Sequence, residues 1–472
     1  MGDLHELTAL EQAAAVRRRE VSASELVEHY LRRADTLGAF VTVTAERALT
    51  VARAADLLVS RTLEPAELPP LLGVPTAIKD LTATAGVRTT FGSAVYARYV
   101  PSLDDDVVRL LADAGTISLG KTSTPEFGLP CYTEPAGLPP AVTPWDTSLL
   151  AGGSSGGAAA AVAGGLVPFA QGSDGGGSIR GPAAACGVVG LKPSRGRVSR
   201  GPAAGDVTLL SVIGPLARTV DDAAALLDAM AVVCPAEPVF APPLPPGQNF
   251  LHHARRGPGR LRIGRYADSS LLGVELAAEC RQAWEDTSTL LDGLGHDVVD
   301  TTSPFDPEVL LPAFEVLWAV SAHSVPVPQG EQDALLPLTR WLRERGAAVS
   351  GPEFLQAIAR VQHVGRAVVA AHADFDAVLT PTLAQLPRPV GWFSSAPTPA
   401  EDFERQKRYV PYNALYNVTG QPAISLPLHW TDDGLPVGVQ LVGRPAGEGS
   451  LLALAGQLER ACPWAQRRPP TW

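Results

Sequence analysis

Residues 152–180 read GGSSGGAAAAVAGGLVPFAQGSDGGGSIR and contain two glycine-rich clusters that both carry serine. Between the clusters, the small side chains of residues 158–165 predict a closely packed helix, and residues 166–170 predict a short strand that leads into the second cluster. Glycine tolerates backbone torsion angles that other residues avoid, and it lets the main chain approach a ligand. A helix and a strand joined by such loops indicate an α/β protein.

The sequence on both sides of this stretch continues the alternation of helices and strands. Upstream, a helical pattern covers residues 7–60, with a capping box from Ser22 to Glu25, and a buried strand over residues 71–78 leads into Lys79. An amphipathic helix is expected over 106–114, a strand over 116–119, and further strands over 376–382, 417–427 and 436–444. These segments favour a largely parallel or mixed sheet.

The chain of 472 residues is expected to form a single domain over 1–472. A proline-rich connector at 235–246 is followed by helical patterns and proline-rich loops over 250–400, where no motif is recognisable. The motif-rich parts therefore define a core over about 60–230 and 375–460. The segment at about 235–400 is expected to vary and to face the substrate.

Composition excludes several classes of partner. A net charge of −11 disfavours nucleic acid, and the longest apolar run, residues 158–170, is too short to cross a membrane. Five cysteines occur without CxxC or zinc-finger spacing, which favours free thiols in a reducing compartment. The N-terminus has no secretory signal, so a cytoplasmic protein without a membrane, nucleic acid, metal or cofactor partner is expected.

The residues around the glycine clusters provide the parts for acyl transfer. A serine hydroxyl such as that of Ser178 needs a base, and the developing oxyanion needs fixed N–H donors such as those of a glycine loop. The chain has four lysines, and Lys79 ends an apolar run, where loss of solvent would lower its pKa. Alternatively, the glycines only form tight turns and Ser154 or Ser155 only caps a helix.

A second motif competes for the same residues. Residues 152–156 satisfy G-x-S-x-G, the nucleophile elbow of α/β-hydrolases, which would make Ser154 the nucleophile of an esterase. That motif needs a strong strand before it, and residues 147–151 form only a short, weak one. It also needs a catalytic histidine, for which the chain offers the following candidates: His323, His363, His372 and His429.

Eight segments carry further motifs: 73–80, 120–122, 125–127, 144–145, 152–157, 172–180, 186–193 and 420–427. Together they resemble the amidase signature family over most of the chain, and the block 152–180 is most similar to the branch containing 6-aminohexanoate cyclic-dimer hydrolase. The resemblance implies an α/β/α sandwich with a mixed central β-sheet flanked by helices. It also implies an amidase that hydrolyses a linear or cyclic carboxamide, a small molecule, without a cofactor or a metal.

The resemblance also implies roles for individual residues. Ser178 would be the nucleophile, Ser154 the bridging serine after a cis peptide bond, and Lys79 the neutral base that moves a proton through Ser154. The backbone N–H groups of Gly175, Gly176, Gly177 and Ser178 would form the oxyanion hole. Ser155, Asp174 and Arg180 would fix the loop, and water would hydrolyse the acyl-serine intermediate.

The substrate pocket is expected along the loop of Phe127, Gly128, Leu129 and Cys131, whose apolar side chains favour an apolar or aryl acyl group. Trp318, Trp392 and Phe403 are further candidates for the pocket or for ordinary packing. Gly175 stands where many family members carry threonine or a bulky residue, which should widen the oxyanion hole.

Three other functions remain open. A glutamyl-tRNA amidotransferase A-like subunit would need partner subunits and would transfer ammonia, and an esterase would use Ser154. A non-catalytic relative would bind an amide or a partner, although Lys79, Ser154 and Ser178 are all present. A homodimer is a further option for the assembly.

Overall fold

The computed structural model describes residues 3–33, 35–203, 205–269, 271 and 273–472. Its strands are β1 (Phe40–Val43), β2 (Pro75–Lys79), β3 (Ile117–Thr122), β4 (Val142–Thr143), β5 (Asp146–Leu150), β6 (Phe169–Asp174), β7 (Val189–Lys192), β8 (Val212–Ala217), β9 (Arg262–Arg265), β10 (Asp297–Asp300), β11 (Ala377–Pro381), β12 (Ala423–Trp430) and β13 (Pro436–Gly443).

The α-helices are α1 (Ala9–Arg17), α2 (Ala23–Arg32), α3 (Ala45–Arg61), α4 (Asp106–Asp113), α5 (Gly156–Ala163), α6 (Arg180–Cys186), α7 (Val220–Met230), α8 (Phe250–Arg255), α9 (Ala278–Gly293), α10 (Pro307–Ser324), α11 (Pro337–Ala347), α12 (Gly351–Ala371), α13 (Pro399–Tyr409), α14 (Ala414–Thr419) and α15 (Glu448–Ala461). Short 3-10 helices are η1 (Leu4–Glu6), η2 (Pro65–Glu67), η3 (Ala94–Tyr96), η4 (Glu126–Gly128) and η5 (Gln332–Ala334).

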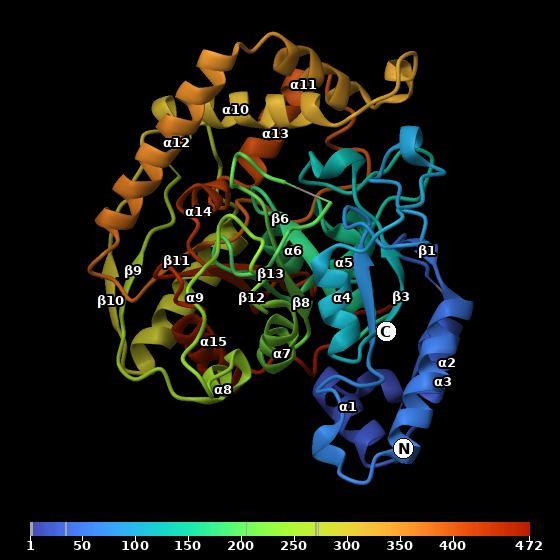
Figure 1. The fold of residues 1–472 in the computed structure, drawn as a ribbon. Helices are drawn as coiled ribbons and strands as arrows, with labels where there is room; N and C mark the ends of the chain where they lie inside the picture. Colours follow the sequence, from blue (N-terminus) through green and yellow to red (C-terminus); the bar gives the residue numbers. More distant parts are fainter. Residues whose placement is uncertain (1–2, 34, 204, 270, 272) are drawn as a thin grey trace.

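One mixed sheet runs through the centre of the molecule (Figure 1). Within the described ranges it has eleven strands in the order β1-β3-β2-β6-β8-β7-β12-β13-β11-β9-β10, while β4 and β5 form a separate ribbon. Strand β2 is parallel to both β3 and β6, and β9 is parallel to β10 and β11, whereas the remaining neighbours are antiparallel. The sequence-based prediction of a mixed sheet is confirmed.

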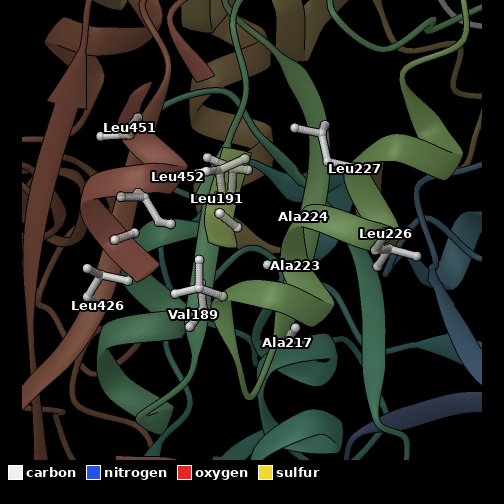
Figure 2. Packing of buried hydrophobic residues seen from close by; sticks show 14 of the residues in the cluster. Val189, Leu191, Ala217, Ala223, Ala224, Leu226, Leu227, Leu426, Leu451 and Leu452 are labelled. Carbon is white, nitrogen blue, oxygen red and sulfur yellow. The ribbon is translucent and has the colours of Figure 1, made fainter. Parts of the chain in front are cut away.

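Apolar side chains cover both faces of this sheet. Successive strand residues point to opposite faces, and in β6 Phe169 joins one buried cluster while Ala170 joins the other. Leu216 and Ala217 of β8 divide between the clusters in the same way. Figure 2 shows the first cluster, in which β7, β12, α7 and α15 meet. Helices α2, α3 and α5 contribute to the second cluster, so the predicted α/β/α sandwich is confirmed.

Several boundaries differ from the sequence-based prediction. The capping box of Ser22 and Glu25 is present at the start of α2, but the region 7–60 is interrupted by strand β1. Residues 417–419 belong to helix α14, which ends at Gly420 with a left-handed φ of 74°, so the strand begins at Ala423. Strands β7 to β10 were not predicted.

Helices α10, α11 and α13 lie together at the top of the view in Figure 1, and α12 packs beside α10. They come from the middle segment of the chain and cover one end of the sheet. None of the helices in the described part of the chain is long and apolar enough to cross a membrane.

Candidate active site

Lys79 is the last residue of β2, and its parallel neighbour β6 ends at Asp174. The ends of two adjacent parallel strands therefore bring Lys79 to the loop that follows β6. Lys79 is fully buried, and its Nζ atom lies 2.8 Å from Ser154 Oγ and 2.8 Å from Ser155 Oγ. Burial lowers the pKa of Lys79 to about 7, although the Asp174 carboxylate raises it. A large share of this lysine is consequently neutral at neutral pH.

Ser154 and Ser155 precede α5, and the Gly153–Ser154 peptide bond is cis. A side chain at position 153 would not fit, because its Cβ atom would lie 2.5 Å from the backbone nitrogen of Tyr132. Ser155 occupies the N-cap position of α5, but its side chain forms no capping hydrogen bond. Its hydroxyl instead donates to the Ser173 carbonyl oxygen at 3.0 Å, so the capping alternative is wrong for this side chain.

Asp174 organises the second glycine cluster. Its carboxylate accepts hydrogen bonds from the backbone of Gly177 and Ile179 and from the guanidinium of Arg180, 2.9 Å from Asp174 Oδ1. Burial raises the pKa of Asp174, but the charge and hydrogen bonds of Arg180 prevail and hold it well below its usual value. The loop thus closes around a buried, charged carboxylate.

The backbone donors of this loop divide into two groups. Gly177 N–H donates to Asp174 Oδ1 at 2.8 Å, which removes it from the predicted oxyanion donors. The N–H groups of Gly175, Gly176 and Ser178 form no hydrogen bond to any described residue. These three groups are the donors available to a ligand.

Ser178 lies in the wall of a cavity of about 740 Å³ that opens to solvent. Leu129 and Cys131 belong to the same wall, as predicted from their loop, and so do Trp318 and Phe403.

Three further pocket candidates lie elsewhere. Phe127 packs in the cluster behind the wall, and Gly128 lies close to Ser154, since a Cβ atom there would be 3.4 Å from Ser154 Oγ. Trp392 packs edge-on against Phe393, with ring centroids 4.8 Å apart, and is a packing residue.

Two polar residues of the site escaped the sequence analysis. Ser173 Oγ lies 3.1 Å from Lys79 Nζ, and its place beside Asp174 in the motif was the only signal for it. Gln406 of α13 accepts a hydrogen bond from the backbone of Cys131 at 3.0 Å and donates to Asp402, which also accepts from Tyr132. Gln406 therefore fixes the pocket loop from a segment that carries no recognisable motif.

The geometry does not assemble an α/β-hydrolase elbow. The strand before Ser154, β5, belongs to the small ribbon and not to the central sheet. Ser154 Oγ contacts Lys79, whereas His429 pairs with Asp286 at 3.0 Å and His372 packs beside Phe375. None of the four candidate histidines forms a hydrogen bond with Ser154 within the described ranges.

Known proteins resemble the chain over nearly its whole length. The family model for amidases matches residues 25–452. The candidate amidase AmiB2 of Mycobacterium tuberculosis is 40% identical over 478 residues, which cover 99% of this chain and 98% of that protein. The glutamyl-tRNA(Gln) amidotransferase of Moorella thermoacetica has an A-type subunit that is 35% identical, with 99% of both chains covered. The structure of 6-aminohexanoate cyclic dimer hydrolase complexed with substrate matches with a TM-score of 0.88 and 30% identity, over 99% of both chains.

Proposed function

The chain belongs to the amidase family and is an amide-hydrolysing enzyme, and we propose that its reaction passes through an acyl intermediate on Ser178. The observation that carries this proposal is the buried contact of 2.8 Å between Lys79 Nζ and Ser154 Oγ, beside a loop that exposes Ser178 and three free N–H groups to one cavity. The substrate is a small-molecule amide, linear or cyclic, hydrolysed in the cytoplasm.

The first half of the proposed reaction forms the acyl-enzyme. Neutral Lys79 accepts the proton of Ser154, which in turn accepts the proton of Ser178. Ser178 Oγ then attacks the amide carbonyl carbon. The negative charge on the carbonyl oxygen is stabilised by the free N–H groups of Gly175, Gly176 and Ser178.

The second half releases both products. The proton on Lys79 returns through Ser154 to the amide nitrogen, and the C–N bond breaks to release the amine. A water molecule, deprotonated by the same route, attacks the acyl carbon and releases a carboxylic acid and free Ser178. Asp174 and Arg180 contribute by fixing the loop that holds the N–H donors, as their mutual hydrogen bonds support.

The experiment that tests this mechanism is intact-protein mass spectrometry after treatment with a fluorophosphonate. Wild type, Ser178→Ala and Ser154→Ala are compared, and the adduct is mapped by peptide digestion. An adduct on Ser178 that disappears in Ser178→Ala supports the proposal. An adduct on Ser154 transfers the nucleophile to that residue and favours the esterase alternative.

The likeness to part of an amidotransferase keeps a second function testable. A hydrolase releases amine and acid from an amide when it is the only protein present, whereas the alternative requires partner subunits and transfers ammonia. Purified chain is therefore assayed alone, with the cyclic dimer of 6-aminohexanoate among the first amides because of the similar hydrolase. Sedimentation of the same sample distinguishes a monomer, a homodimer and a hetero-complex.

A further inference from the structure

Two aromatic side chains of α10 lie against the loop that carries the free N–H groups. Phe314 and Trp318 are four residues apart on one face of the helix and stack with ring centroids 5.3 Å apart and an angle of 18° between their planes. Both rings belong to the wall of the cavity that contains Ser178. They form a flat apolar surface beside the proposed nucleophile.

The rings meet the loop at its glycines. A Cβ atom at position 175 would lie 3.4 Å from two ring atoms of Trp318, and one at position 176 would lie 3.6 Å from Phe314 Cζ. The space that the missing side chain of Gly175 leaves is therefore filled by Trp318. The expectation that Gly175 widens the oxyanion hole is wrong for this chain, because the tryptophan takes up that room.

The polar side chains in the same wall are already paired. Lys407 Nζ contacts Glu315 Oε1 at 2.6 Å and Glu404 Oε1 at 2.5 Å, so two carboxylates neutralise its charge. Gln406 is occupied by Asp402 and by the backbone of Cys131. A charged acyl group would lose water here without gaining a free partner of opposite charge.

We propose that the pair Phe314–Trp318 selects the acyl group of the substrate and favours amides whose acyl group is apolar and uncharged, either aryl or alkyl. The inference rests on the proposed function, since a carbonyl oxygen bound by the N–H groups of Gly175 and Gly176 places the acyl carbon beside both rings. Gly175 and Trp318 then form a complementary pair, in which the glycine makes room for the ring and the ring shapes the pocket.

The test uses 4-nitroanilides that share a leaving group and differ in the acyl group: acetyl, butyryl, valeryl, hexanoyl, benzoyl and succinyl. For wild type, kcat/KM should rise about fourfold for each added methylene, the factor for burying one methylene group. Succinyl, which replaces the end of the valeryl chain with a carboxylate, should react at least tenfold more slowly than valeryl. Equal rates for these two acyl groups would contradict the proposal.

Trp318→Ala should lower kcat/KM about tenfold for hexanoyl and benzoyl substrates while changing the acetyl substrate little, because a short acyl group does not reach the indole. The matched control is Trp341→Ala, since Trp341 packs in the same cluster of side chains but lies outside the cavity wall. If Trp318→Ala does not fold, Trp318→Leu keeps most of the volume and removes the flat ring. An unchanged acyl preference in a folded Trp318 variant overturns the inference.

A double-variant cycle tests the contact between Gly175 and Trp318. Gly175→Thr should reduce hydrolysis of the benzoyl substrate, and Trp318→Ala in the same chain should restore part of it, because the smaller side chain frees the space. Strictly additive losses would contradict the contact.

Alkyl fluorophosphonates of increasing chain length separate this inference from the proposed function. If no probe labels Ser178, the mechanism itself fails. If every probe labels Ser178 at the same rate in wild type and in Trp318→Ala, the mechanism stands and the selectivity wall does not.

Discussion

At the scale of single residues, three buried lysines show what is special about Lys79. Burial lowers the pKa of Lys121 to about 8 and that of Lys192 to about 7, so a low pKa alone does not mark the base. Lys121 lies 3.9 Å from the Asp80 carboxylate, and Lys192 donates to a backbone carbonyl. Lys79 instead contacts three serine hydroxyls beside a cavity, and a hydroxyl can exchange a proton with it.

The pH dependence follows from the lowered pKa of Lys79. The proposed base must be neutral, so kcat/KM should be constant at high pH and fall as the pH drops through about 7. A rate profile between pH 5 and 9, measured with a slow anilide so that chemistry limits the rate, gives the apparent pKa. Lys79→Arg should abolish hydrolysis at every pH because arginine keeps its proton. A wild-type rate that is flat across this range would contradict the lysine mechanism.

Ser154 and Ser155 are equally close to Lys79 but differ in their remaining bonds. Ser155 accepts from Lys79 and donates to Ser173 O, so both directions of its hydroxyl are used. Ser154→Ala should therefore lower kcat by a factor of about 10² to 10⁴, the range for loss of a proton-transfer group, and Ser155→Ala by much less. Steady-state kinetics with one anilide measure both. A larger loss in Ser155→Ala would make that serine the bridge.

The sequence predicted the residues whose chemistry is concentrated in short motifs, and it missed those that act across the fold. Lys79, Ser154 and Ser178 lie in or beside conspicuous runs of residues. Gln406 and Phe314 lie in helices with ordinary composition, so only the three-dimensional contact reveals them. The engagement of Gly177 N–H by Asp174 likewise depends on how the loop closes.

At the scale of elements, a buried carboxylate joins the catalytic half to the helices of the middle segment. Glu126 of η4 accepts from Ser93 Oγ at 2.7 Å and from the backbone N–H of Leu336 at 2.8 Å. Leu336 immediately precedes α11, whose N-terminus has no side-chain cap of its own. Glu126 thereby fixes the start of α11, which packs against α10 and its aromatic wall.

Glu126→Ala should leave two buried donors without partners and lower the free energy of unfolding by about 1–3 kcal/mol. Glu126→Gln is the matched control, because its amide oxygen can accept from Leu336 while its amide nitrogen donates to Ser93. Hydrogen exchange of the first turn of α11 measures the local effect and urea unfolding the global one. Unchanged protection in Glu126→Ala would show that α11 does not depend on this contact.

The elements that sequence patterns missed share one physical reason. Strands of a sheet covered on both faces lack the alternation of polar and apolar residues that marks an exposed strand. In β8 every residue is buried, and β7 is likewise buried throughout, so their short apolar runs carry no period. Helices α4 and α5 were easier to predict because each is bounded by glycine.

At the scale of the whole molecule, Arg180 connects distant parts of the chain. Its guanidinium is completely buried and contacts Asp174 near its own position in the sequence. It also donates to Asn417 Oδ1 at 2.7 Å and to Gln440 Oε1 at 2.6 Å, residues more than 230 positions later. The proposed core of residues 60–230 and 375–460 is thus held together at the floor of the active site, which favours one domain.

Arg180→Met should destabilise the protein by about 3–5 kcal/mol, because it leaves the buried Asp174 carboxylate without its countercharge. Adding Asp174→Asn removes that charge as well and should recover part of the loss. Since the network spans both parts of the core, we expect one cooperative transition in urea, at the same midpoint by circular dichroism and by tryptophan fluorescence. The control, Arg18→Met, removes an exposed ion pair with Glu20 and should leave the midpoint unchanged. Two separate transitions, of which Arg180→Met shifts only one, would mean that the two parts of the chain fold as independent units.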